Sequence, residues 1–282
     1  MITVIFLKIQ SNVFSVHENN GVTYLTYDAI SEIPFIRHAF STKLGEDSTT
    51  IHPMDMSFDH DDRGAVTKNY RMLCDAAGFD YHSLVASSQD HHTYVRVVTS
   101  AEKGIGIYRE KDMESVDALV TNEPGVTLCT YYADCTPIFF VDPQKKAIGL
   151  AHAGWRGTVD RIAAKVIDTM RKSCGTDPAD LVCAIGPNIM VCCYEVDEPC
   201  AERFCALGLD SERFIHPKGG GKYMADMLEC NRQILMSCGV AAENITLSDL
   251  CTRCSSDFLW SHRATKGDRG TMCAMMRINP DE

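Results

Sequence analysis

The sequence predicts an α/β fold of the mixed α+β type, a single domain over residues 1–282 in which mixed β-sheets are flanked by helices. Short apolar runs rich in β-branched and aromatic residues indicate strands. Segments with apolar residues at helical spacing indicate helices, and no linker, repeat or block of charge divides the chain. Of the 282 residues, 45% are hydrophobic, which is enough to bury a substantial core.

The N-terminal part is predicted to contain strands, a loop and one helix. The opening segment MITVIFLKIQ is too short for a signal peptide and is soon followed by polar residues, so it is interpreted as a first strand. Two strands, a polar loop and a helix follow, over residues 22–30, 35–42, 45–62 and 63–79. In this helix Val66, Tyr70, Leu73 and Ala77 follow helical spacing, and Gly78 provides the stop.

The middle of the chain is predicted to form consecutive strands, over residues 84–89, 94–99, 118–121, 126–132, 137–142 and 146–153. Asp142-Pro143 marks a tight turn between the last two strands. The remainder is predicted to have helices at 159–174, 197–208 and 226–240 and strands at 181–187, 245–251 and 272–278. Ile162, Val166 and Met170 share one face of the first of these helices, which predicts that this face is buried.

Composition narrows the classes of function. A net charge of −11 argues against a nucleic-acid-binding protein, which normally presents a basic face, but it allows a small anionic substrate held by a few arginines. No run of apolar residues is long enough for a membrane-spanning helix. The 14 scattered cysteines predict a cytoplasmic protein with reduced thiols, in which a functional cysteine is a metal ligand or a nucleophile.

Polar side chains stand at the ends of the most apolar strands. Asp134 and Cys135 lie between two such runs, and His152 ends a third. The Asp142-Pro143 turn joins the last two of these strands and would bring Cys135 close to His152. A thiolate and a neutral imidazole are both ligands for zinc or copper.

His91 or His92, just before another strand, supplies a third candidate ligand. One cysteine and two histidines form a ligand set of catalytic zinc sites, which keep a position open for substrate. Two other interpretations use the same residues. Cys135 could be a nucleophile with His152 as its base, as in cysteine hydrolases. Buried cysteines and histidines are also common as inert core residues.

The segment HAGWRG, which begins at His152, has features of an anion site. Its small residues allow a ligand to approach the backbone, and the planar guanidinium of Arg156 suits phosphate or carboxylate, although a structural salt bridge would also explain it. A helix is expected to begin near Thr158, and its first amides would also favour an anion.

Three segments nearer the C-terminus have weaker interpretations. A cationic cluster is predicted to form a substrate loop or a solvated turn, and it comprises Ser261, His262, Arg263, Lys266 and Arg269. Cys251 and Cys254 lack a second pair at zinc-ribbon spacing, and Cys192-Cys193 is interpreted as core packing. The segment GGGK is a flexible turn, because it lacks the spacing of a phosphate loop.

The order of several motifs resembles the laccase-domain family, formerly called polyphenol oxidases or multicopper-oxidase-like proteins. The motifs are SSQDHHTYV, DALVT, ADCTPIFFVD, AHAGWRGTV, AIGPNIMVCCYEV, DLCT and SHR followed by RGT. The resemblance extends from about residue 38 to residue 278. It implies a purine nucleoside phosphorylase, with associated adenosine deaminase and methylthioadenosine phosphorylase activities.

The resemblance implies a zinc site, with copper as the alternative, formed by His91, Cys135 and His152. His92 stands where the family usually has glycine, so the sequence does not decide whether His91 or His92 binds the metal. Lys43 replaces an arginine that the family usually has, and Asp268 precedes Arg269 in a loop of variable spacing. These departures affect the expected substrate contacts more than the metal site.

The implied reaction is phosphorolysis of adenosine, inosine or methylthioadenosine to the free base and a ribose 1-phosphate. Cys135, His152, Asp134 and Arg156 are the expected catalytic residues, with Asp134 acting either in proton transfer or in orienting a ligand. The expected substrate-binding residues are Lys43, Asn69 and Arg263. The alternatives are a Cys–His hydrolase or amidase and, ranked lower, a copper-dependent polyphenol oxidase, since ten scattered histidines do not form several clusters. The expected partners are purine nucleosides and phosphate, with no nucleic acid or membrane, and the chain is expected to be a monomer or homodimer.

Overall fold

The computed structural model describes residues 9–280, so the predicted strand at the N-terminus falls almost entirely outside the described residues. A first sheet has six strands, in the order β1 (Phe14–Asn19), β2 (Val22–Tyr27), β3 (Ile36–Gly45), β15 (Met272–Ile278), β7 (Thr127–Tyr132) and β4 (Leu84–Ala86). Its strands are antiparallel, except that β4 pairs with β7 in parallel.

A second sheet also has six strands, in the order β14 (Ile245–Leu247), β10 (Val182–Ile185), β8 (Thr136–Asp142), β9 (Ala147–Ala153), β6 (Val116–Thr121) and β5 (Tyr94–Val97). The edge pairs β10–β14 and β5–β6 are parallel and the central pairs are antiparallel. A small third sheet consists of β11 (Glu195–Asp197), β13 (Lys222–Ala225) and β12 (Ile215–Gly219). The fold is therefore mixed α+β, as predicted.

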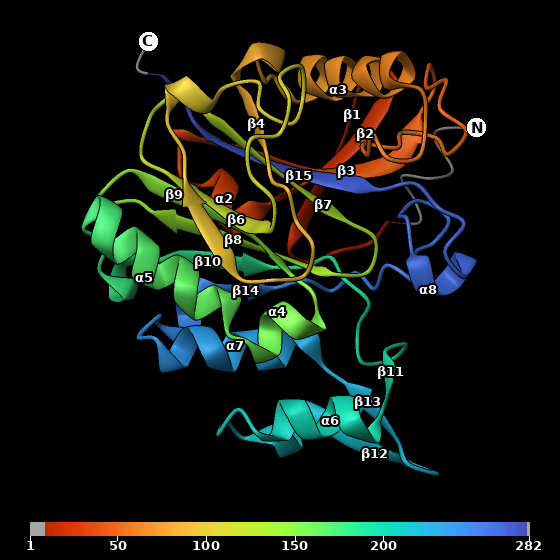
Figure 1. Cartoon of the computed structure of the whole chain (residues 1–282), viewed down its shortest axis with the longest axis vertical. Coiled ribbons are helices and arrows are strands. Elements are labelled where there is room, and N and C mark those ends of the chain that lie inside the picture. Colours follow the sequence, from red (N-terminus) through yellow and green to blue (C-terminus); the bar gives the residue numbers. More distant parts are fainter. Residues whose placement is uncertain (1–8, 281–282) are drawn as a thin grey trace.

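Helices cover the outer faces of the two large sheets (Figure 1). The α-helices of the described residues are α2 (Asp28–Ser31), α3 (Arg63–Ala77), α4 (Trp155–Val159), α5 (Ile162–Cys174), α6 (Glu198–Cys205), α7 (Met227–Ser237) and α8 (His262–Thr265). Helix α3 lies on the first sheet, α5 and α7 lie on the second, and α6 covers the small sheet at one end of the molecule (Figure 1). None of the helices within residues 9–280 combines the length and apolarity that crossing a membrane requires.

The core follows from the two-residue period of buried strands. All seven residues of β8 are buried, and their side chains alternate between two hydrophobic clusters. Phe139 and Val141 face the first sheet, whereas Ile138 and Phe140 face α5 and α7. A strand that is buried between two apolar layers has apolar residues on both of its faces. Its sequence is therefore a continuous apolar run, which predicts the strand.

Local signals set the bounds of the main helix of the first sheet. The Asp62 carboxylate accepts hydrogen bonds from the amides of Gly64 and Ala65 at the start of α3. The helix ends at Gly78, which adopts the left-handed conformation with φ of 74°. The predicted apolar face, which includes Val66 and Tyr70, is buried as expected.

Some predicted elements differ from the structure. The segment 22–30 is only partly a strand, since α2 begins at Asp28, and a helical turn begins at Trp155 rather than near Thr158. The sequence does not predict β1, β11, β12 and β13, because these short and largely exposed strands lack an apolar run. It also does not predict α8, which has only four residues. Gly220 and Gly221 of the GGGK segment form the turn between β12 and β13.

Candidate metal centre and its pocket

Cys135 and His152 lie at the same end of a β-hairpin. Strands β8 and β9 are antiparallel neighbours, with Thr136 opposite Ala153 and Pro137 opposite His152. The predicted turn follows Asp142, whose carboxylate accepts hydrogen bonds from the amides of two turn residues. Cys135 directly precedes β8, so this register brings it beside His152. The Asp142-Pro143 turn predicts the same neighbourhood.

His91 completes the group from the loop between β4 and β5. Its Nε2 lies 3.8 Å from Sγ of Cys135, and its ring centroid lies 4.9 Å from that of His152. One ligand atom from each of His91, Cys135 and His152 can be chosen so that all three lie within 4.8 Å of one another. The neighbouring His92 ring is exposed, and its Nδ1 lies 2.5 Å from a carboxylate oxygen of Asp90. His91, and not His92, therefore belongs to the cluster.

A residue that the sequence analysis missed holds this cluster together. Asp117, at the start of β6, is fully buried, and its Oδ1 lies 2.8 Å from Nδ1 of His152. The carboxylate also accepts hydrogen bonds from the backbone amides of Asp90, His91 and His92. Because Asp117 occupies Nδ1 of His152, Nε2 of this ring is the nitrogen available to a metal. An acidic residue within the apolar run of β6, in the DALVT motif, was the available signal.

The residues fit a single metal ion. Two imidazoles and one thiolate make a donor set suited to zinc or copper. A glycine next to the cluster leaves room for it: a Cβ on Gly154 would lie 2.8 Å from Cδ2 of His91 and 3.4 Å from Sγ of Cys135. Any larger residue at position 154 would displace a candidate ligand.

Cys135 and His152 alter one another's protonation. Burial acts to raise the pKa of the Cys135 thiol, but the adjacent His152 and His91 outweigh it and lower this pKa to about 6. Burial acts to lower the pKa of His152, but Cys135 and Asp117 outweigh it and raise this pKa to about 9. Without a metal, the pair is a thiolate beside an imidazolium at neutral pH.

The lowered pKa of Cys135 predicts how the rate of its alkylation depends on pH in metal-free protein. We expect its reaction with iodoacetamide, followed by peptide mass spectrometry, to be nearly constant from pH 8 to pH 7. The rate should fall about tenfold per pH unit once the pH is well below about 6, because the thiolate then takes up a proton. A rate that still rises steeply above pH 8, as for an ordinary thiol, would show that the pair does not form.

The three candidate ligands line a pocket of about 1120 Å³. Its cationic side chains outnumber the acidic ones, although the whole chain is acidic; the cations are Arg63, Arg109, Lys111, Arg263 and Arg269. Aromatic rings line it as well, namely Phe58, Tyr108, Tyr131, Tyr132 and Tyr194. The pocket thus combines cations for an anionic group with apolar surface for a planar ring.

Asp134 lines the pocket but has its carboxylate committed to protein partners. Its Oδ1 accepts a hydrogen bond from Oγ1 of Thr252 at 2.6 Å, and its Oδ2 accepts one from the amide of Arg263 at 2.7 Å. The residue has a positive φ of 85°, which for a side chain other than glycine requires support from its surroundings. Asp134 joins the segment before Cys135 to two C-terminal loops.

The other predicted site residues lie in different surroundings. Arg263 lines the pocket, with its guanidinium carbon 5.5 Å from the ring centre of Tyr194. Arg156, which stacks on Trp155, does not line it. Asn69 is fully buried, does not line the pocket, and donates to Thr50 and to the carbonyl of Asp55.

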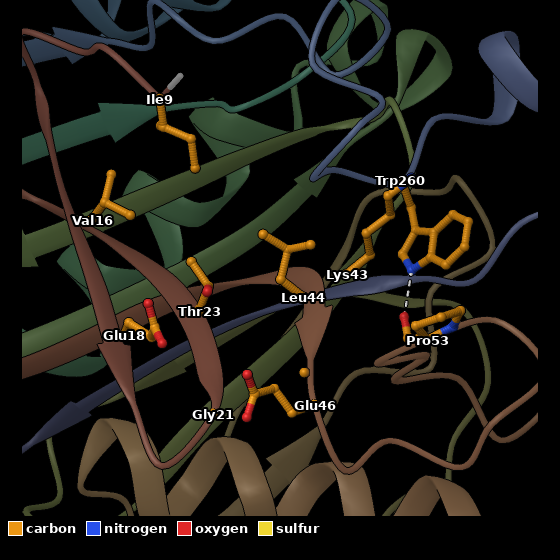
Figure 2. Close-up of a pocket in the computed structure, with 11 residues that line it drawn as sticks. Ile9, Val16, Glu18, Gly21, Thr23, Lys43, Leu44, Glu46, Pro53 and Trp260 are labelled. Atoms are coloured by element: carbon orange, nitrogen blue, oxygen red, sulfur yellow. Dashed lines mark hydrogen bonds between the residues drawn. The ribbon is translucent and has the colours of Figure 1, made fainter. Parts of the chain in front are cut away.

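Lys43 belongs to a separate cavity of about 380 Å³ beside β1, β2 and β3 (Figure 2). Its ammonium group lies 5.0 Å from the ring centre of Trp260 and donates to the carbonyl of Ser256. The indole nitrogen of Trp260 in turn donates to the carbonyl of Pro53, as Figure 2 shows. The structure therefore does not bring Lys43 to the candidate metal centre.

Comparison with known proteins gives consistent matches over most of the chain. The family model described as multi-copper polyphenol oxidoreductase laccase matches residues 37–279. Purine nucleoside phosphorylase YlmD of Bacillus subtilis is 35% identical over 77% of this chain and 78% of that protein. Purine nucleoside phosphorylase LACC1 of Homo sapiens is 31% identical over 91% of this chain and 58% of that protein.

Solved structures have the same fold. The crystal structure of Bacillus licheniformis hypothetical protein YfiH matches with a TM-score of 0.88 and 30% identity, over 95% of this chain and 100% of that one. The crystal structure of YlmD from Geobacillus stearothermophilus matches with a TM-score of 0.87 and 31% identity, over 95% and 99% of the two chains.

Proposed function

The chain belongs to the family described as multi-copper polyphenol oxidoreductase laccase, and we propose that it is a purine nucleoside phosphorylase. The observation that carries the proposal is the cluster of His91, Cys135 and His152 inside a pocket lined by cations and aromatic rings. The relatives named purine nucleoside phosphorylase support it. The substrates would be adenosine, inosine or methylthioadenosine, together with phosphate.

The reaction requires an anion and a nucleoside to be held in line. A phosphate oxygen forms a bond to the anomeric carbon of the ribose while the bond from that carbon to the purine N9 breaks. The base leaves with the electron pair and takes up a proton, and ribose 1-phosphate is the other product. Arg263 and Arg269 would hold the phosphate, and Phe58 and Tyr131 would stack on the base.

His91, Cys135 and His152 would hold the metal ion, zinc or copper. Such an ion would supply Lewis-acid stabilisation of negative charge. Asp117 would keep His152 in the tautomer that presents Nε2, and Asp134 would act as a positioning residue, since both of its oxygens accept hydrogen bonds from other groups. Arg156 would contribute only a more distant positive charge.

Hydrolytic deamination of adenosine is a second reaction proposed for the same pocket. Water would add at C6 of the purine, and ammonia would leave, giving inosine. The donor set of one thiolate and two imidazoles supports this reaction, because related donor sets serve zinc-dependent deaminases. Inosine produced in this way would itself be a substrate for phosphorolysis.

A cysteine hydrolase is the alternative supported by the position of Cys135 beside His152, which lowers the pKa of the thiol to about 6. Cys135 would attack a carbonyl carbon and His152 would donate a proton to the leaving group. The oxidase interpretation has less support. Within residues 9–280, the groups of side chains that could hold a metal include only two of the ten histidines.

Product analysis tests the proposed function directly. We expect purified protein to convert adenosine, inosine or methylthioadenosine to the free base and the sugar 1-phosphate only when phosphate is present. Adenosine should also give inosine and ammonia without phosphate. Absence of turnover with all three nucleosides in metal-loaded protein would refute the proposal. Thiol alkylation that inactivates a metal-free, active protein would support the hydrolase instead.

Arg263 offers a matched pair of variants for the phosphate site. We expect Arg263→Met to raise the KM for phosphate by about 10- to 100-fold, which corresponds to one charge-assisted hydrogen bond. Lys266→Met is the control, because Lys266 directly follows α8, the short helix that carries Arg263, but does not line the pocket. An equal change in both variants would mean that only the general charge of the loop matters.

A further inference from the structure

Four cysteines from two loops meet outside the pocket. Cys192 and Cys193 lie between β10 and β11, and Cys251 and Cys254 lie between β14 and α8. The Sγ atoms of all four lie within 4.8 Å of one another. This corrects the interpretation of Cys192-Cys193 as core packing, and it supplies the second pair that Cys251 and Cys254 lack in the sequence.

The sheet explains why the two loops meet. Strands β10 and β14 are parallel neighbours, with Ile185 opposite Leu247, so the loops that follow them leave the sheet at the same edge. The pairing continues into the loops, where Asn188 bridges Cys251 and the amide of Thr252 donates to the Asn188 carbonyl at 3.0 Å. The cysteine pairs are therefore held together by backbone contacts.

The spacing of three of the four sulfurs is close to that around a single tetrahedral zinc ion. The Sγ atom of Cys193 lies 3.7 Å from that of Cys192 and 3.4 Å from that of Cys254, and the Cys192–Cys254 distance is 3.7 Å. Zinc–sulfur bonds of about 2.3 Å place the sulfurs of a tetrahedral site about 3.8 Å apart. A disulfide would instead draw one pair to about 2.05 Å and leave the other sulfurs aside.

The fourth sulfur has surroundings suited to a thiolate ligand. Cys251 is buried, and its Sγ accepts a hydrogen bond from the amide of Met190 at 3.5 Å. No histidine or carboxylate belongs to this group of described residues, so all of its donors are soft sulfurs. We propose that Cys192, Cys193, Cys251 and Cys254 bind a structural zinc ion, separate from the candidate metal centre.

This zinc site would fix one wall of the pocket. The loop that carries Cys192 and Cys193 also carries Ile189 and Tyr194, which line the pocket. Thr252, between the other two cysteines, donates to the Asp134 carboxylate next to Cys135. Four cysteines leave no position open for a substrate, and none of the four lines the pocket, so the ion would have a structural role.

Metal analysis of variants tests this proposal without an activity assay. We expect Cys254→Ser protein, purified from zinc-supplemented cells, to contain one zinc ion fewer per chain than wild type and to unfold at a lower temperature. Cys205→Ser is the control, since Cys205 is an exposed cysteine outside the cluster, and it should retain the wild-type zinc content. Zinc content that is equal in all three proteins would overturn the proposal.

Two measurements that do not use Cys254→Ser keep the test valid if this variant does not fold. Cobalt-loaded Cys135→Ser protein should retain the strong charge-transfer absorption of a tetrathiolate site. Titration of zinc-loaded Cys135→Ser protein with a mercurial, which reaches the exposed Cys192 and Cys254, should release zinc to a colorimetric chelator. A disulfide among the four cysteines in protein isolated without reductant, or no zinc released as these thiols react, would contradict the site.

Discussion

Replacing Cys135 with alanine is expected to lower the rate of phosphorolysis by roughly a hundredfold or more. Loss of a group that only orients a metal ligand already costs about 10- to 100-fold, and Cys135 is proposed as a ligand itself. The metal content should fall together with the activity. Steady-state kinetics and elemental analysis of the same preparation measure both quantities.

The same variant separates a ligand from a nucleophile. If Cys135 attacks the substrate, alanine abolishes activity but leaves the metal content unchanged. Cys205→Ala is the matched control, because Cys205 is exposed on α6, which covers the small third sheet, and should change neither quantity. Undiminished turnover in Cys135→Ala would remove the residue from the site altogether.

Replacing Asp117 with asparagine is expected to lower metal affinity by about 10- to 100-fold and to destabilise the fold. One carboxylate oxygen becomes an amide NH₂ group. This group faces either the backbone amides of Asp90 and His92 or the backbone amide of His91 together with Nδ1 of His152. Each buried donor that loses its acceptor costs about 1–3 kcal/mol of the free energy of unfolding. Competition with a chelator and urea unfolding measure the two effects.

A surface aspartate provides the comparison for this variant. Asp112 pairs with Arg96, and 48% of its side chain is exposed. Asp112→Asn should therefore leave metal affinity unchanged and cost at most about 1 kcal/mol of stability. Wild-type metal affinity in Asp117→Asn would show that the orientation of His152 does not depend on this carboxylate.

The parts of the site that lie on one hairpin could be predicted from the sequence. The Asp142-Pro143 turn and the two apolar runs on either side of it are enough to place Cys135 beside His152. The choice of His91 over His92 could not be made in this way. It depends on the positive φ of 72° at His91, which turns this ring toward Cys135 and leaves the next ring in solvent.

Contacts between distant strands account for what the sequence analysis missed. Asp117 acts on His152 because β6 pairs with β9, and no spacing rule connects residues 35 positions apart. The four-cysteine cluster depends in the same way on the parallel pairing of β10 and β14. Lys43 was expected at the pocket because of the family motif, but its side chain lies in a separate cavity beside β3.

The central claim is that the metal bound by His91, Cys135 and His152 serves nucleoside phosphorolysis. The most direct measurement is the rate of ribose 1-phosphate formation from adenosine and phosphate, by wild-type protein stripped of metal and then reloaded with zinc. We predict that the stripped wild type is inactive and regains activity as zinc is restored, whereas Cys135→Ala, which keeps the four-cysteine cluster, regains at most about a hundredth of it. Full turnover in protein shown to be metal-free would contradict the claim.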